Sequence, residues 1–122
     1  MRPLRVRIQA FGPYAGAQEL DFAELRGYDF FLITGSTGSG KTTVLDAMTF
    51  ALYGDTSGGE RDARNMRSQH APADLLTEVE FDFAVGDKRY RVHRVPQQSR
   101  PAKRGDGTVT QSRQATLWAL PA

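Results

Sequence analysis

Residues 35–42 combine the residue types that bind phosphate groups. They read Gly-Ser-Thr-Gly-Ser-Gly-Lys-Thr and match G-x-x-x-x-G-K-[ST] at every constrained position. Glycines let such a loop turn its backbone N–H groups inward around an anion, and a helix after the loop adds its positive N-terminal end. The residues expected to bind nucleotide are Gly35, Ser36, Thr37, Gly38, Ser39, Gly40, Lys41, Thr42 and Thr43.

Three side chains of this segment have separate expected roles. Lys41 is predicted to reach the β- and γ-phosphate oxygens and to stabilise the transferring phosphate, so it is the one catalytic residue predicted. The Thr42 hydroxyl is predicted to ligate Mg²⁺, and Thr43 to bond the α-phosphate. The motif therefore predicts ATP and Mg²⁺ as cofactors.

The segments on either side fit a phosphate-binding loop. Residues 28–34 are almost continuously apolar, which is typical of a strand buried on both faces of a sheet. Residues 42–53 place apolar side chains three and four positions apart, which predicts a helix, and Gly54 is expected to end it. A short helix is expected around residues 62–68.

Two hairpins are expected around this unit. Residues 4–9 and 18–22 alternate apolar and charged side chains, so they predict antiparallel strands with arginines facing acids on the outer face. Residues 79–85 alternate in the same way and precede a Gly-Asp turn. Folding back about that turn sets Phe83 opposite Tyr90 and Asp82 opposite Arg91.

Composition narrows the class of protein. The 122 residues include no cysteine, 39% are hydrophobic and the formal net charge is +2. A disulfide scaffold, a thiolate zinc site and a cysteine nucleophile are thereby excluded. No apolar run approaches the ~20 residues that cross a bilayer, and no signal peptide is recognisable. A cytoplasmic protein without membrane contact is expected.

Basic residues are concentrated in one part of the chain. Residues 86–113 hold eight basic and two acidic side chains, a net charge of +6, so the remainder carries −4. This segment either neutralises a polyanion such as DNA or is a solvated surface, and the sequence leaves both open. Within it, residues 96–110 lack periodicity and predict a mobile basic loop, after which residues 114–120 predict one further strand.

The carboxylates that complete a P-loop ATPase are not recognisable here. Such an enzyme needs an acid on another strand for Mg²⁺, but Asp46 is expected to be exposed on the helix and Asp82 on the solvent side of a strand. A general base is therefore not assigned in this chain. The predicted fold class is α/β: residues 1–122 form the N-terminal lobe of a P-loop NTPase, ABC-ATPase-like, with antiparallel hairpins flanking a P-loop strand and one main helix. The domain is expected to be incomplete.

Several segments in this order carry a family resemblance. They are residues 11–14, 20–22, 31–35, 38–47, 51–54, 64–68 and 78–81. Together they resemble the N-terminus of the SbcC-type exonuclease subunits, a family of SMC-like DNA-repair ATPases. The P-loop alone is generic, whereas the spacing of hairpin, P-loop, helix and second hairpin is more specific.

The resemblance implies an ABC-type ATPase head split by a long coiled coil. The N-terminal part would supply the P-loop and a glutamine-containing loop, and the C-terminal part the signature motif, the Mg²⁺ carboxylate and the catalytic glutamate. Two heads would form a homodimer around two ATP molecules, and an SbcD-type metal-dependent nuclease partner would cut DNA ends. The implied function is the ATP-binding part of a DNA double-strand-break repair and recombination ATPase.

The resemblance also raises roles for side chains outside the P-loop. The turn at residues 11–14 and the arginines at 61, 64 and 67 would lie near the base or ribose, or else Phe11 is core and the arginines are solvated. Three glutamines, Gln69, Gln97 and Gln98, are not assigned to the family's glutamine loop. The two histidines, His70 and His93, are not assigned to a metal site or to acid–base catalysis.

Three other classes remain as alternatives. A transporter-type ABC ATPase would place a glutamine loop a few tens of residues after the P-loop, but residues 71–96 contain no glutamine. A P-loop kinase generally opens with its P-loop strand, whereas here a hairpin precedes residue 28. A basic β-rich nucleic-acid module would leave the P-loop unexplained.

Overall fold

The structure, a computed structural model, describes residues 1–22, 41–54, 67–68, 70–105 and 107–121. Its elements are β1 (Arg2–Phe11), β2 (Tyr14–Asp21), α1 (Lys41–Tyr53), β3 (Glu78–Val85), β4 (Lys88–Val95), β5 (Gln98–Pro101), β6 (Thr108–Gln111) and β7 (Gln114–Ala119). The predicted strand at 28–34 and residues 62–66 of the predicted short helix lie outside the described residues.

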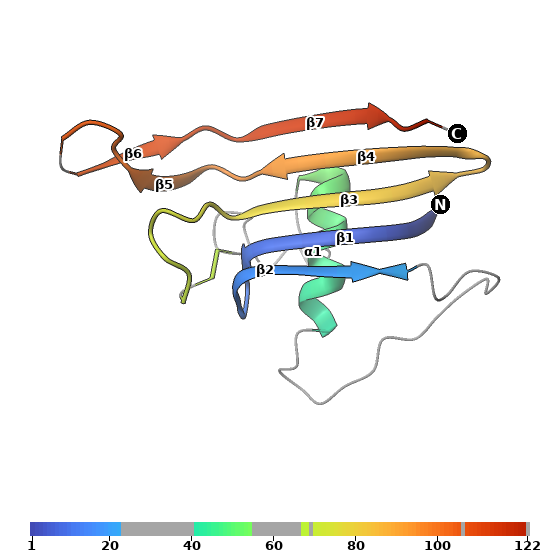
Figure 1. Cartoon of the computed structure of the whole chain (residues 1–122), viewed down its shortest axis with the longest axis horizontal. Coiled ribbons are helices and arrows are strands. Elements are labelled where there is room, and N and C mark those ends of the chain that lie inside the picture. Colours follow the sequence, from blue (N-terminus) through green and yellow to red (C-terminus); the bar gives the residue numbers. More distant parts are fainter. Residues whose placement is uncertain (23–40, 55–66, 69, 106, 122) are drawn as a thin grey trace.

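Five strands form one antiparallel sheet in the order β2-β1-β3-β4-β7. The short strands β5 and β6 pair with each other as a second antiparallel unit. Figure 1 shows this hairpin extending past the end of the sheet, where it continues the pair β4 and β7. The expectation of an irregular loop over residues 96–110 is therefore wrong for Gln98–Pro101 and for the β6 residues that begin at Thr108.

The first hairpin has the predicted pairing, with Arg5 opposite Asp21 and Arg7 opposite Glu19. Its strands run closer to the turn than the alternation suggested, because the register continues to Phe11 opposite Tyr14 after a bulge. Leu20 is 41% exposed although its alternation predicted an apolar inner position. Leu20 lies on the edge strand β2. Among the described elements, α1 packs mainly against β1, β3 and β4, so the helix does not cover this position.

The second hairpin confirms the predicted register at each pair. Phe83 lies opposite Tyr90, and Asp82 opposite Arg91. Because side chains alternate along a strand, this register places the aromatic residues on one face and the charged residues on the other. The aromatic face continues inward from Tyr90 to Phe83 and Phe81, with ring centroids 5.6 and 5.5 Å apart.

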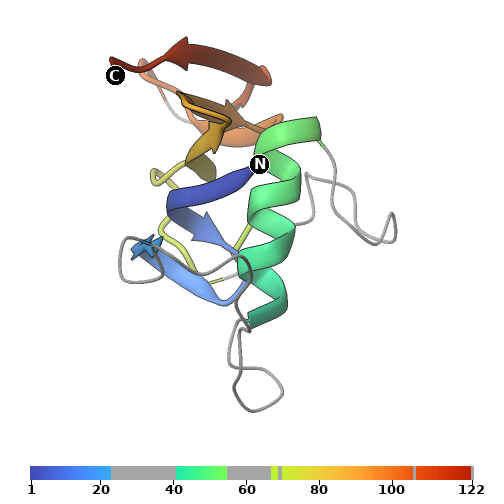
Figure 2. The same cartoon turned by 90° about the vertical axis from the view of Figure 1, so that its right-hand side faces the viewer.

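Helix α1 covers the apolar face of the sheet (Figure 2). It packs against β1, β3 and β4. The core formed between the helix and the sheet consists of Val6, Ile8, Phe11, Phe22, Val44, Ala47, Phe50, Ala51, Val79, Phe81 and Val92. Gly54 ends the helix as predicted, with φ of 80° and its N–H donating to the Phe50 carbonyl at 2.7 Å. The sheet thereby fixes the position of the helix, and Gly54 fixes its end.

Candidate nucleotide-binding site

Helix α1 begins at Lys41, directly after the glycine-rich segment. No acidic residue occupies its first turn, so no carboxylate of that turn opposes an anion at the positive end of the helix. Residues 35–40 and the side chains of Lys41 and Thr42 lie outside the described part of the structure. Their contacts with phosphate and Mg²⁺ therefore stay predictions from the sequence.

The turn between β1 and β2 lies against the first turn of α1. A Cβ on Gly12 would come within 2.9 Å of Thr43 Cγ2 and 3.2 Å of Thr43 Oγ1, and Gly12 has φ of 56°. Both the close approach and the left-handed backbone require glycine at this position. Thr43 itself is buried, so the β1–β2 turn positions the end of the helix where the nucleotide is predicted. The sequence around Gly12 did not predict this contact with Thr43, because a single glycine before Pro13 indicates only a turn.

Phe11 lies in the core and not on a nucleotide-facing surface. Its side chain is fully buried, and its ring centroid lies 6.1 Å from that of Phe50. Of the two interpretations that the sequence left open, the core position is the one found. Tyr14, across the same turn, is partly buried against the core.

Arg67 organises the loop that leads into β3. Its guanidinium donates to the carbonyls of Leu75 and Pro72 and lies 3.3 Å from Gln98 Oε1. Gln98 is buried and in turn bonds both the N–H and the carbonyl of Thr77, at 2.8 and 2.9 Å. Arg67 therefore supports the backbone of this loop. Arg61 and Arg64 lie outside the described residues, so a place for these arginines near the base or ribose stays a prediction.

The same loop is joined to the β1–β2 turn. The Ala10 carbonyl accepts from the Ser68 N–H at 2.9 Å and from Thr77 Oγ1 at 2.6 Å. Ala10 has a positive φ of 49°, a conformation that costs an L side chain free energy. These two bonds hold the strained carbonyl in place.

Asp82 is buried, which corrects the expectation that it faces solvent. It accepts a two-pronged contact from Arg91, Nε to Oδ1 at 2.7 Å and Nη2 to Oδ2 at 2.9 Å. Arg5 lies 3.5 Å from the same carboxylate. Neighbouring side chains on the strand face cover Asp82, an effect that alternation along one strand does not reveal.

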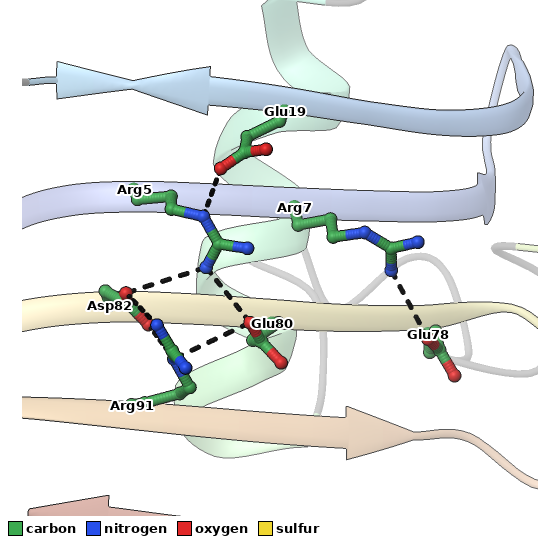
Figure 3. A network of polar contacts seen from close by, with 7 residues as sticks. All are labelled: Arg5, Arg7, Glu19, Glu78, Glu80, Asp82 and Arg91. Atoms are coloured by element: carbon green, nitrogen blue, oxygen red, sulfur yellow. Dashed lines mark hydrogen bonds and ion pairs between the residues drawn. The ribbon is translucent and has the colours of Figure 1, made fainter.

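The contacts of Asp82 belong to a network across four strands on the face opposite α1 (Figure 3). Its members are Arg5, Arg7, Glu19, Glu78, Glu80, Asp82 and Arg91. Arg5 bonds Glu19 and, at 3.0 Å, Glu80, so it bridges β2 and β3 from its place on β1. The bond with Asp82 raises the pKa of Arg91 against the opposing effect of burial. Each arginine of this network contacts at least one of its carboxylates, so the network is internally paired.

Asp46 is also buried, contrary to the exposed position expected on the helix. The described residues contain no cluster of three or more His, Asp or Glu side chains able to hold a metal ion.

The two histidines have separate contacts. His93 Nε2 lies 3.6 Å from Glu78 Oε2, and the backbone N–H of His70 donates to Ser68 Oγ at 3.2 Å.

The sequence did not predict the contact between Arg94 and the end of α1. Arg94 Nε donates to the Ala51 carbonyl at 3.0 Å, so it caps the C-terminal end of α1. Burial lowers its pKa. The alternation of β4 contained the signal, since Arg94 falls on the same face as Val92 and therefore toward the helix.

In the described part of the chain, no helix is long and apolar enough to cross a bilayer. A family model described as "AAA domain" matches residues 5–117. The chain is 49% identical over 120 residues to the SbcC subunit of the nuclease SbcCD from Vibrio cholerae, covering 98% of this chain and 12% of that protein. The proteins of the same name from Lactococcus lactis and Staphylococcus aureus are 45% and 38% identical, over 96% and 93% of this chain and 11% of each relative. The chain thus spans about one eighth of the length of the curated relatives it matches, and the resemblance drawn from the sequence is confirmed.

Proposed function

Since the chain belongs to the AAA domain family, we propose that it is the ATP-binding N-terminal part of a DNA double-strand-break repair and recombination ATPase. The observation that carries this proposal is the complete P-loop motif, whose last two residues, Lys41 and Thr42, begin helix α1. The relatives, named as SbcC subunits of the nuclease SbcCD, support this class over a transporter ATPase or a kinase.

The chain's own residues have defined tasks in this proposal. Backbone N–H groups of residues 35–40 surround the phosphates, Lys41 neutralises their β- and γ-oxygens, and Thr43 bonds the α-phosphate. The Thr42 hydroxyl would hold Mg²⁺, which would supply charge neutralisation to the triphosphate when bound. Gly12 maintains this arrangement because it allows the β1–β2 turn to approach Thr43.

The proposal extends to the protein of which this chain is about one eighth. Its catalytic carboxylates would come from outside residues 1–122, two heads would enclose ATP in a homodimer, and an SbcD-type nuclease partner would process DNA ends with it. The name of the relatives, which makes each of them part of a nuclease, supports the partner. A DNA-processing ATPase of this class is expected in the cytoplasm.

Substitution Lys41→Ala tests the site directly. Calorimetric titration of ATP with Mg²⁺ is expected to show binding at the P-loop of the parent chain and loss of that binding in the variant, because a charge-assisted contact to the phosphates is removed. Lys88→Ala is the matched control, since Lys88 is exposed beside the β3–β4 turn and makes the same change of charge. Equal affinity in Lys41→Ala and the parent would refute the proposal.

A further inference from the structure

A pocket of about 570 Å³ lies at the C-terminal end of α1, far from the P-loop end. It is bounded by the last turn of the helix, by the link from β4 to β5 and by the beginning of β7. Figure 1 shows the C-terminal end of α1 behind the sheet near β4. The residues that line it are Phe50, Tyr53, Gly54, Arg94, Val95, Pro96, Gln97, Arg113, Gln114 and Ala115. A volume of this size is ordinary for small-molecule sites.

The charged groups of the pocket are of one sign. Arg94 and Arg113 line it, and none of its described lining residues is acidic. Arg94 uses Nε to cap the helix, and within the described part of the chain it has no carboxylate partner. Burial lowers its pKa without a compensating acid, in contrast to Arg91. An anion entering the pocket would supply the missing compensation.

The remaining wall offers an aromatic surface and two amides. Both Tyr53, which is 77% exposed, and Phe50, which is buried, line the pocket. An exposed aromatic ring beside arginines is the arrangement on which proteins stack a nucleic-acid base while holding its phosphate. The side chains of Gln97 and Gln114 carry both donors and acceptors, so they can bond the edge of a base.

We propose that this pocket binds a nucleoside phosphate at a second site, with the base against Tyr53 and the phosphate between Arg94 and Arg113. Two sources share this chemistry: a free mononucleotide, and an unpaired nucleotide at the end of a DNA strand. The site is independent of the P-loop, because the 13 residues of α1 separate the two by about 20 Å.

The negative end of the helix does not oppose such a ligand. Arg94 already neutralises the last carbonyls through its bond to Ala51, and Gly54 satisfies the Phe50 carbonyl. The second cation, Arg113, is exposed to solvent, so no burial opposes its charge. A phosphate would therefore meet one partly buried and one solvated guanidinium.

The experiment uses the full chain carrying Lys41→Ala, so that P-loop binding is removed. Calorimetry is performed with AMP and, separately, with a 5′-phosphorylated thymidine dinucleotide. In this background Arg113→Gln and Tyr53→Ala are each expected to weaken binding at least about fivefold, since each removes a phosphate contact or a stacking surface. Tyr53→Phe keeps the ring, and Arg2→Gln removes a charge at the far end of β1, so both are expected to bind like the background chain.

The outcomes separate the possibilities. Binding of AMP alone assigns the site to free nucleotides, and binding of the dinucleotide alone assigns it to strand ends. Absence of binding by both probes overturns the proposal while leaving the P-loop proposal intact, as does an equal loss in Arg2→Gln, which would indicate a diffuse electrostatic effect. Displacement of both probes by an acidic peptide, with unchanged affinity in Tyr53→Ala, would also overturn it in favour of a peptide groove.

Discussion

The arginines of the five-stranded sheet and those near its β5–β6 hairpin occupy contrasting environments. On the face opposite α1, Arg5 and Arg91 share the carboxylates of Glu80 and Asp82 and join neighbouring strands. At the end of β4 and in the β5–β6 hairpin, Arg94 bonds a backbone carbonyl and Arg104 is exposed. The net charge of +6 over residues 86–113 therefore overstates the number of cations available to a ligand. Two of these side chains, Arg91 and Arg94, already bond other groups within the fold.

The largest effect is expected from breaking the paired region. Asp82→Ala removes the acid shared by Arg5 and Arg91 and leaves both guanidinium groups partly uncompensated. We expect the free energy of unfolding to fall by about 2 kcal/mol, since the carboxylate is buried while Arg91 is still partly solvated. Urea denaturation measures this, with Asp74→Ala, an exposed acid before β3, as control. Equal midpoints for the two variants would contradict a structural role for the network.

An intermediate effect is expected where an arginine supports the backbone without an acid. Arg94→Ala removes the bond to the Ala51 carbonyl and should lower the free energy of unfolding by about 1 kcal/mol. Arg113→Ala, in the same pocket but exposed, should change it by less than about 0.5 kcal/mol. Thermal denaturation of the two variants distinguishes an arginine that supports the backbone from one that is only exposed to solvent. A larger loss in Arg113→Ala would reverse the assignment.

The smallest effect on stability is expected in the β5–β6 hairpin, whose exposed basic side chains are expected to act by electrostatic attraction to DNA. Arg104→Gln should leave the unfolding midpoint unchanged but reduce the slope of log affinity for duplex DNA against log salt by about 1. Fluorescence anisotropy over a salt series measures the slope. Arg2→Gln, exposed at the start of β1, is the matched control. An unaltered slope in Arg104→Gln would indicate that the hairpin charge serves solubility.

The sequence predicted those parts of the fold in which local rules agree. In the β3–β4 hairpin, alternation and a Gly-Asp turn specify one register, and Phe83 meets Tyr90 as expected. Strands β5 and β6 escaped detection because they are four residues long and mostly exposed, so neither face selects apolar residues. Their pairing follows instead from their place at the end of β4 and β7.

For the candidate site, the sequence predicted the motif but not its surroundings. The P-loop is contiguous, so residue types alone identify it. The approach of Gly12 to Thr43 and the burial of Asp82 beside Arg5 depend on segments distant in the chain, which the residue pattern of one strand does not encode. Burial of a polar residue is set by the side chains around it rather than by its own position in an alternation.

The position of β1 between β2 and β3 has a consequence for the order of folding. Each hairpin closes over a few residues, whereas pairing of β1 with β3 brings Arg5 to Asp82 across the intervening chain, including α1. Closing that long loop costs chain entropy that only the assembled sheet and helix repay. We therefore expect the zipping of β1 onto β3 to be the slow step, so that Val6→Ala, at this junction, retards refolding more than Tyr90→Ala within the local hairpin.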